Sequence, residues 1–204
     1  MKHHAHMARQ DTTREQIVAA ADRLFYEQGF DHTSFAHIAD AVGISRGNFY
    51  YHFRAKDEIL AAVIDLRLAR TRQMLDDWQA QGADPAARIR SFFHMLVANR
   101  AAIAMHGCPV GTLCNELAKL DHPSHGAAAA LFTLFRTWLH GQFVDAGFAA
   151  AEADRHALHA LVLSQGIATL ASALRDERTL RHEVRLAEEW LAGCLGRGAQ
   201  SDHH

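Results

Sequence analysis

The segment from Thr33 to Phe53 constrains the fold of this 204-residue chain more than any other. Its first half places apolar residues at i, i+3, i+4 and i+7, which predicts a short helix with one buried face. These residues are Phe35, Ile38, Ala39 and Val42. Thr33 is the expected N-cap, Gly43 provides the left-handed residue that ends the helix, and Ser45 suits the N-cap of a second helix. The pattern therefore predicts two short helices joined by a tight turn.

The second helix has one buried and one outward face. Ile44 and Phe49 have the spacing of a hydrophobic staple, and Phe53 extends the same apolar stripe. The remaining side chains are small, basic or aromatic, namely Arg46, Gly47, Asn48, Tyr50, Tyr51 and His52. Such a face on the second helix of a helix–turn–helix fits the major groove of DNA. The alternative is a solvated helix face with ordinary aromatic residues.

The chain around this motif resembles the DNA-binding domain of TetR-family transcriptional regulators. The matches are spread without gaps over residues 12–60: Gly29-Phe30, Thr33-Ser34, Ile38-Ala39, Gly43-Ile44-Ser45, Gly47, Tyr50, His52-Phe53 and Lys56. The resemblance implies an all-α homodimer, usually a repressor that a small molecule releases from a palindromic operator. A three-helix DNA-binding domain over residues 8–56, with its motif at 33–53, would be joined by a long fourth helix to an effector-binding and dimerisation domain over 57–197.

The resemblance also implies which residues contact double-stranded DNA. They are Thr33, Ser45, Arg46, Gly47, Asn48, Tyr50, Tyr51, His52 and Lys56. By this resemblance Thr33 and Lys56 would hold phosphates at helix N-termini, as would Tyr50 and His52. Arg46, Gly47, Asn48 and Tyr51 would lie nearest the base edges, where arginine reads guanine and asparagine reads adenine through paired hydrogen bonds.

Composition agrees with an all-α chain but does not itself indicate nucleic-acid binding. There are only three prolines, and the formal net charge is −2. The charge is uneven, however, because residues 41–56 contain three basic side chains and no acidic one. DNA binding would then rely on this local basic strip, together with helix N-termini and polar contacts.

The chain ends and the cysteines bear on localisation. Residues 1–7, Met-Lys-His-His-Ala-His-Met, have the composition of a tag remnant and no apolar signal region, so we leave them out of the fold prediction. Three cysteines in no framework spacing are typical of a reducing cytoplasm. Residues 156–174 are uncharged but contain several polar side chains, which favours a buried helix and no membrane partner.

Two helix limits are predicted from capping patterns. Thr12 and Glu15 have the spacing of a capping box at the start of the first helix. Pro85 suits the first turn of a fifth helix that continues to about His106.

An effector pocket is expected among the fourth to seventh helices, where the family places its ligand. The candidate lining residues are Phe92, Met95, Leu96, Cys108, Phe132, Phe135 and Trp138. Few fixed charges occur in this region, so any effector should be small and largely apolar. The alternative is that these side chains are ordinary core, in a DNA-binding dimer that needs no ligand.

Cys108 and Cys114 are candidate thiol sensors. Cys108 lies in a Gly-Cys-Pro bend, and a subset of TetR-like regulators with a similar segment senses electrophiles or oxidants through cysteine. The N-terminus of the following helix would stabilise a thiolate. The alternative is a small side chain that packs a tight bend. The histidines and cysteines of this region match no standard spacing of zinc ligands. They are His106, Cys108, Cys114, His122 and His125. We therefore expect no metal and no cofactor.

The last two helices, predicted at about 151–174 and 179–195, contain small and apolar stripes that suit a dimer interface. The interface residues would be Ala157, Leu161, Ser164, Ala168, Ala171, Val184 and Leu191. Periodicity alone is equally consistent with packing inside one chain. No glycine-rich phosphate loop, nucleophile elbow or paired His/Glu metal motif occurs, so the chain is not expected to be an enzyme.

Overall fold

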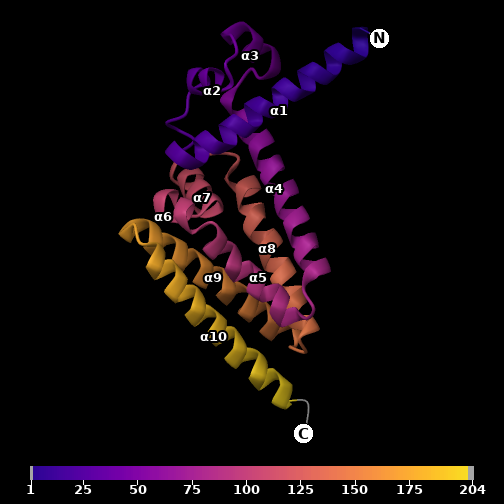
Figure 1. The fold of residues 1–204 in the computed structure, drawn as a ribbon, viewed down its shortest axis with the longest axis vertical. Coiled ribbons are helices and arrows are strands. Elements are labelled where there is room, and N and C mark those ends of the chain that lie inside the picture. Colours follow the sequence, from indigo (N-terminus) through magenta and orange to yellow (C-terminus); the bar gives the residue numbers. More distant parts are fainter. Residues whose placement is uncertain (1, 202–204) are drawn as a thin grey trace. The chain divides into compact units, whose positions relative to one another are not determined.

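The computed structural model describes the backbone of residues 2–201 and the side chains of residues 12–196. Over this range the chain forms ten α-helices and no strand, which confirms the all-α prediction (Figure 1). The tag-like stretch 1–7 lies outside the residues whose side chains are described.

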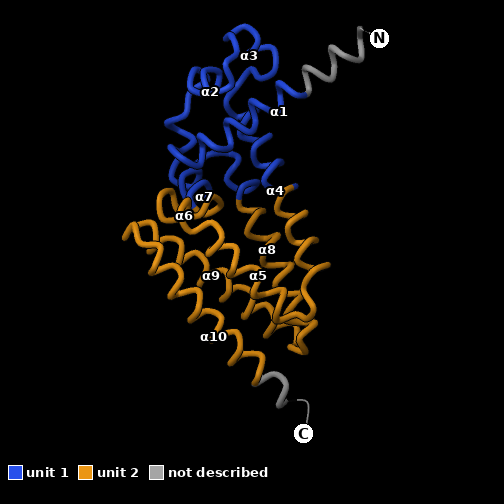
Figure 2. Tube along the Cα trace, viewed as in Figure 1, with its two compact units in different colours: residues 1–69, 112–128 blue, residues 70–111, 129–204 orange. Residues whose placement is uncertain are grey.

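The helices belong to two compact units (Figure 2). Unit 1 consists of the described residues up to Ala69 together with Thr112–Ala128, and unit 2 of Arg70–Gly111 and the described residues from Ala129 onward. The unit boundaries fall inside three helices, whereas the domain boundary expected from the family resemblance lies after residue 56. The helix–turn–helix motif therefore shares its compact unit with a segment far away in the sequence.

Unit 1 contains α1 (Lys2–Gln28), α2 (Phe35–Val42), α3 (Arg46–His52), the first part of α4 (Lys56–Gln81) and most of α7 (Pro109–Lys119). The helix α1 begins well before the predicted start at Thr12, because no glycine or proline interrupts the preceding residues. Its inner face is buried at Ile17, Ala21 and Phe25.

Unit 2 contains α5 (Pro85–Ala98), α6 (Arg100–His106), most of α8 (His125–Asp145), α9 (Ala150–Leu174) and α10 (Glu177–Ser201). The single helix predicted over 85–106 is in fact two, because Asn99 leaves helical geometry at ψ 14° and its side-chain amide donates to the Met95 carbonyl at 2.8 Å. Gly107 ends α6 with φ 80° and ψ −168°, a conformation that essentially only glycine adopts.

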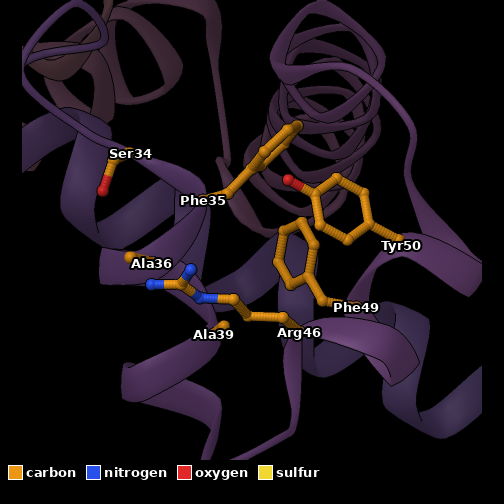
Figure 3. A pocket seen from close by; sticks show the side chains of 7 residues that line it. All are labelled: Ser34, Phe35, Ala36, Ala39, Arg46, Phe49 and Tyr50. Atoms are coloured by element: carbon orange, nitrogen blue, oxygen red, sulfur yellow. The ribbon is translucent and has the colours of Figure 1, made fainter.

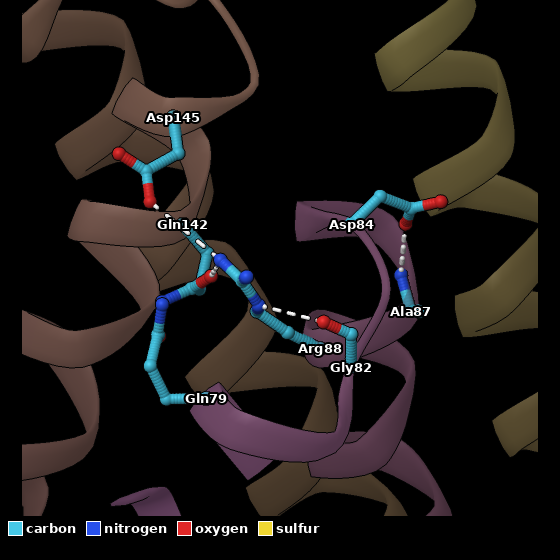
Figure 4. A network of polar contacts seen from close by, with 7 residues as sticks. All are labelled: Gln79, Gly82, Asp84, Ala87, Arg88, Gln142 and Asp145. Carbon is cyan, nitrogen blue, oxygen red and sulfur yellow. Dashed lines mark hydrogen bonds and ion pairs between the residues drawn. The ribbon is translucent and has the colours of Figure 1, made fainter.

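A polar network ties α4, α5 and α8 together within unit 2 (Figure 4). The buried Gln142 donates to Gln79 Oε1 at 2.7 Å, and Arg88 Nε donates to the Gly82 carbonyl at 3.2 Å. Asp84 caps α5 by accepting the Ala87 N–H at 2.7 Å. These bonds fix how the end of α4 leads into α5.

The helices α9 and α10 lie side by side in unit 2 (Figure 1). Asp176 caps α10 by accepting the Arg178 N–H at 2.9 Å and the Thr179 hydroxyl at 2.9 Å. These two bonds lower the pKa of Asp176, since both favour the charged carboxylate. Within residues 2–201, α9 alone has the length and composition to cross a membrane, and one of its faces packs into the unit 2 core.

The residues predicted to form the dimer interface are buried inside one chain. Ala157, Leu161, Ser164, Ala168, Ala171, Val184 and Leu191 are all at most 7% exposed. Side chains that are already covered within the monomer add no area to a dimer contact, so this assignment needs correction. The predicted small and apolar stripes are present on α9 and α10, but they face the core of the same chain.

Candidate nucleic-acid interface

The helix–turn–helix is built from local capping interactions. Ser34 accepts the His37 N–H at 3.2 Å while His37 Nδ1 accepts the Ser34 N–H at 3.2 Å, which completes a reciprocal capping box at the start of α2. Gly43 ends α2 with φ 73° and ψ 35°. Ser45 then caps α3 by accepting the Asn48 N–H at 3.3 Å. The predicted capping roles of Gly43 and Ser45 are confirmed.

Aromatic and aliphatic side chains hold α2 and α3 together. Ile38, Phe49 and Phe53 are at most 1% exposed, and the Phe35 ring lies 5.1 Å from that of Phe49. The predicted buried stripe is therefore present. Because one side of α3 packs in this core, its opposite side faces outward in an orientation that is fixed relative to α2.

The outward side of α3 carries residues that we expected to contact DNA. Arg46, Gly47 and Asn48 are exposed, as are Tyr50 at 51% and Tyr51 at 68%. Within the described residues, the Arg46 guanidinium has neither a hydrogen bond nor an ion pair. It lies along a groove of about 290 Å³ between α2 and α3, lined by Ser34, Phe35, Ala36, Ala39, Arg46, Phe49 and Tyr50 (Figure 3).

Thr33 has a different role from the one predicted. It is 1% exposed, its hydroxyl donates to the Gly29 carbonyl at 2.6 Å, and it accepts from Gln28 Nε2 at 3.2 Å. Ser34, rather than Thr33, is the N-cap of α2. A buried hydroxyl that is already paired is unsuited to hold a phosphate, so the hydroxyl that faces solvent at this helix start is that of Ser34.

Lys56 is also engaged inside unit 1. Its Nζ donates to the carbonyls of Phe30 at 2.9 Å and Asp31 at 3.3 Å, and lies 4.3 Å from the centre of the Phe30 ring. The expected phosphate contact would compete with these interactions. His52 is half-buried at the end of α3, where its ring lies 5.3 Å from Tyr51.

Glu116 is a residue of this unit that the sequence did not reveal. From α7 it accepts the N–H groups of Phe30 and Asp31, each at 2.9 Å. No local pattern could have identified it, because 85 residues separate Glu116 from Asp31. The one available signal was the isolated Gly29, which marks a place where another group approaches the backbone closely.

The candidate effector residues lie in or against the core of unit 2. Phe92, Leu96 and Phe135 are at most 5% exposed, and Met95, Cys108, Phe132 and Trp138 pack against them. Trp138 has a distinctive feature, because its buried indole Nε1 has no hydrogen-bond partner among the described residues.

None of the three cysteines forms a disulfide within the described residues. Cys108 Sγ accepts the Gly111 N–H at 3.5 Å and the Gln165 amide at 3.4 Å, so this side chain caps the first turn of α7. Cys114 is buried at 6% exposure. No group of three metal-ligating side chains occurs within the range whose side chains are described.

Two short helices at a tight turn, the second with an exposed polar and aromatic face, define a helix–turn–helix protein. The family model described as "Bacterial regulatory proteins, tetR family" matches residues 17–63, and one described as "Transcriptional regulator LmrA/YxaF-like, C-terminal domain" matches residues 85–185. The chain belongs to the TetR family of bacterial transcriptional regulators, which are not enzymes.

Similar proteins share the sequence in part and the fold almost throughout. An uncharacterized HTH-type transcriptional regulator in the lacX 3′ region of Lactococcus lactis is 31% identical over 59% of this chain and 63% of its own length. The HTH-type regulator LmrA of Bacillus subtilis is 31% identical over 54% of this chain and 60% of its own. The chain thus spans less than two thirds of these curated relatives. A TetR regulator from Legionella pneumophila superposes with a TM-score of 0.76 at 24% identity, over 86% of this chain and 95% of that one.

Proposed function

We propose that this chain is a sequence-specific DNA-binding repressor that acts in the cytoplasm and places α3 in the major groove of its operator. The observation that carries the proposal is the outward face of α3, where Arg46 has no partner among the described residues. An arginine without an intramolecular partner is free to form a bidentate contact with a guanine edge. The descriptions of its relatives as transcriptional regulators support the same function.

We propose a homodimer that forms through the exposed faces of α9 and α10. Five large apolar side chains on these helices are 42–63% exposed: Leu158, Val162, Leu170, Leu174 and Leu186. Those on α9 recur at multiples of four residues, with Gly166 between them, so they follow one ridge that is inclined to the helix axis. Several large apolar side chains exposed on two neighbouring helices are typical of a protein interface.

Selection from a random library of double-stranded DNA tests the proposed function. A two-fold dimer carries two copies of α3, so the enriched sequence should be nearly palindromic, with half-sites about one helical turn or a small multiple apart. Binding should weaken steeply as salt rises, because counterions are released from phosphates. Failure to enrich any sequence, or enrichment of a single asymmetric site, would contradict the proposal.

We further propose that unit 2 binds a small, largely apolar effector carrying a hydrogen-bond acceptor. The support is Trp138, whose buried N–H lacks a partner within the described residues while its ring lies 5.6 Å from that of Trp78. A buried donor without an acceptor costs about 1–3 kcal/mol and is rare in native proteins. An oxygen on the effector would remove that cost.

Matched pairs of apolar ketones and hydrocarbons test this proposal by calorimetry. Ketones that bind the wild-type protein should lose about three- to tenfold in affinity for Trp138→Phe, which keeps the ring but removes the donor. The hydrocarbons should bind both proteins equally. If ketone and hydrocarbon lose affinity alike, Trp138 contributes packing only. If none of these compounds releases the selected DNA, the alternative of a ligand-independent DNA-binding dimer is favoured.

Thiol-based sensing is a second candidate function, and the capping role of Cys108 favours it. Alkylation of its Sγ would disturb the acceptor that holds the Gly111 N–H and the Gln165 amide. A Cβ on Gly111 would meet Gln165 Oε1, so the Gln165 amide packs directly against the first turn of α7. Cys114 does not serve as a disulfide partner while α7 is intact, since six residues of helix rise by about 9 Å.

Release of the selected DNA by N-ethylmaleimide tests this second function. Wild-type protein and Cys114→Ser should be released, whereas Cys108→Ser should stay bound. If Cys108→Ser is released as readily as the wild type, Cys108 is a packing residue and any effector acts without a covalent bond.

A further inference from the structure

The turn between α1 and α2 is held from two directions by oppositely charged side chains. The Glu116 carboxylate accepts the N–H groups of Phe30 and Asp31, one on each oxygen, at 2.9 Å. The Lys56 ammonium donates to the carbonyls of the same two residues at 2.9 and 3.3 Å. Two consecutive residues thus have all four of their backbone polar groups bound by side chains. Bonds of this kind to charged groups are roughly twice as strong as bonds between neutral groups.

Gly29 makes the approach of the carboxylate possible. It has φ +92°, and a Cβ at this position would lie 3.0 Å from Glu116 Oε1. A side chain here would therefore strain the backbone and crowd the carboxylate at the same time. The glycine and the glutamate fit together although 87 positions separate them in the sequence.

This turn sets the place from which the helix–turn–helix begins. The Thr33 hydroxyl ties the end of the turn back to the Gly29 carbonyl at 2.6 Å, and Ser34 follows directly as the N-cap of α2. The Phe30 ring packs edge-on against Phe25 at 5.2 Å, which connects the turn to α1. A shift of the turn would therefore shift α2, and α3 with it, because the two helices share one core.

We propose that Glu116 is a positioning residue for the DNA-binding face, so that the functional DNA-binding unit includes α7 and not only the N-terminal motif. The inference rests on the proposed function. Glu116 lies outside residues 17–63, the part of the chain that matches the N-terminal family domain, but it belongs to the same compact unit. The Asp31 N–H is exposed, so water would replace the Glu116 carboxylate there if that carboxylate were removed. The protein would then lose little stability, but the turn would no longer be held in one position.

The sign of the effect separates positioning from electrostatics. Removal of a carboxylate makes the protein less negative, which by itself would strengthen binding to every DNA sequence. Loss of positioning instead weakens binding to the selected sequence. We expect Glu116→Ala to lose about tenfold in affinity for the DNA sequence selected by the wild-type protein. A loss of this size is typical of substitutions that change a binding site without contacting its ligand. Affinity for random-sequence DNA should stay the same or rise, and Glu116→Gln, which keeps one acceptor, should fall in between.

Asp84→Ala is the matched control. It also removes a carboxylate that accepts a backbone N–H, that of Ala87 at 2.7 Å, but at the start of α5 in unit 2 (Figure 4). This variant should lower thermal stability and leave the affinity for the selected DNA unchanged. Amide hydrogen exchange in the full-length protein gives a readout without DNA, since the Phe30 and Asp31 amides should exchange faster in Glu116→Ala only.

Three results would overturn the inference. The first is wild-type affinity of Glu116→Ala for the selected DNA, and the second is an equal loss for selected and random DNA. The third is unchanged exchange at Phe30 and Asp31, which would show that the carboxylate does not hold the turn. If the wild-type protein selects no sequence, the proposed function fails and the positioning role fails with it, whereas the exchange measurement still decides whether Glu116 holds the turn.

Discussion

The basic side chains near the DNA-binding face differ in what they already bind within the protein. Within the described residues, the Arg46 guanidinium has no partner, whereas the Lys56 ammonium has two carbonyls and an aromatic ring. Arg46 is thus available for a base, and Lys56 is committed to the turn before α2. Substitution of the two residues should therefore affect DNA binding in different ways.

Arg46→Ala should reduce the preference for selected over random DNA by about 1–3 kcal/mol, the value of one base-reading arginine.

Lys56→Ala should lower thermal stability and leave the slope of affinity against salt unchanged, because its bonds are made inside the protein. Titration of both variants with selected and random duplexes at several salt concentrations measures each effect. If the salt slope of Lys56→Ala is smaller by the amount that corresponds to one neutralised phosphate, Lys56 does contact a phosphate, as the sequence predicted.

At the level of elements, the start of α10 has a pH-dependent cap. The pKa of Asp176 is lowered by the bonds from the Arg178 N–H and the Thr179 hydroxyl. A lowered pKa in the folded state means that the carboxylate stabilises the fold above the ordinary aspartate value of about 3.9, and that this contribution is lost as the pH falls through the lower value. Unfolding of wild type and Asp176→Asn between neutral and acidic pH should show a stability difference that shrinks below about pH 4. A difference that stays constant with pH would show that the charge of Asp176 does not matter.

The outer face of α9 carries the proposed dimer contact. Val162→Glu should give a monomer by sedimentation, because it would place an unpaired charge in the interface. Operator affinity should then fall on the order of a hundredfold, since two linked half-site contacts become one. Val162 is 57% exposed, so the fold of the single chain should be kept.

Val144→Glu is the control for this substitution. Val144 belongs to α8 and is 42% exposed, so the same change is made at an exposed apolar residue that is not part of the proposed interface. This variant should remain dimeric with unchanged affinity. If Val162→Glu also remains dimeric, the interface lies on another surface.

At the scale of the whole molecule, local patterns predicted the elements better than they predicted which faces meet. Gly43 and Ser45 end and begin helices as expected, because their signals depend on neighbouring backbone only. The face of α9 could not be chosen from periodicity, since Ala157 and Ala168 on the buried side and Val162 on the exposed side are all apolar. Glu116 was missed because its bonds join segments that are distant in the sequence.

The same distinction applies to the compact units. Capping and periodicity place the end of the motif at Phe53, and the resemblance implies a domain that ends at residue 56, but the compact unit continues along α4 to Ala69 and includes Thr112–Ala128. A prediction from local sequence could not include that second segment, because nothing in its composition marks it as a partner of the first.

The most direct test of the central claim, that a two-fold dimer reads DNA with α3, is a hydroxyl-radical footprint of the full-length protein on its selected sequence. We predict two equally protected patches related by a two-fold axis, about one helical turn or a small multiple apart. Arg46→Ala should lose base discrimination within both patches equally. A single protected patch, or two patches of which only one responds to Arg46→Ala, would contradict the account.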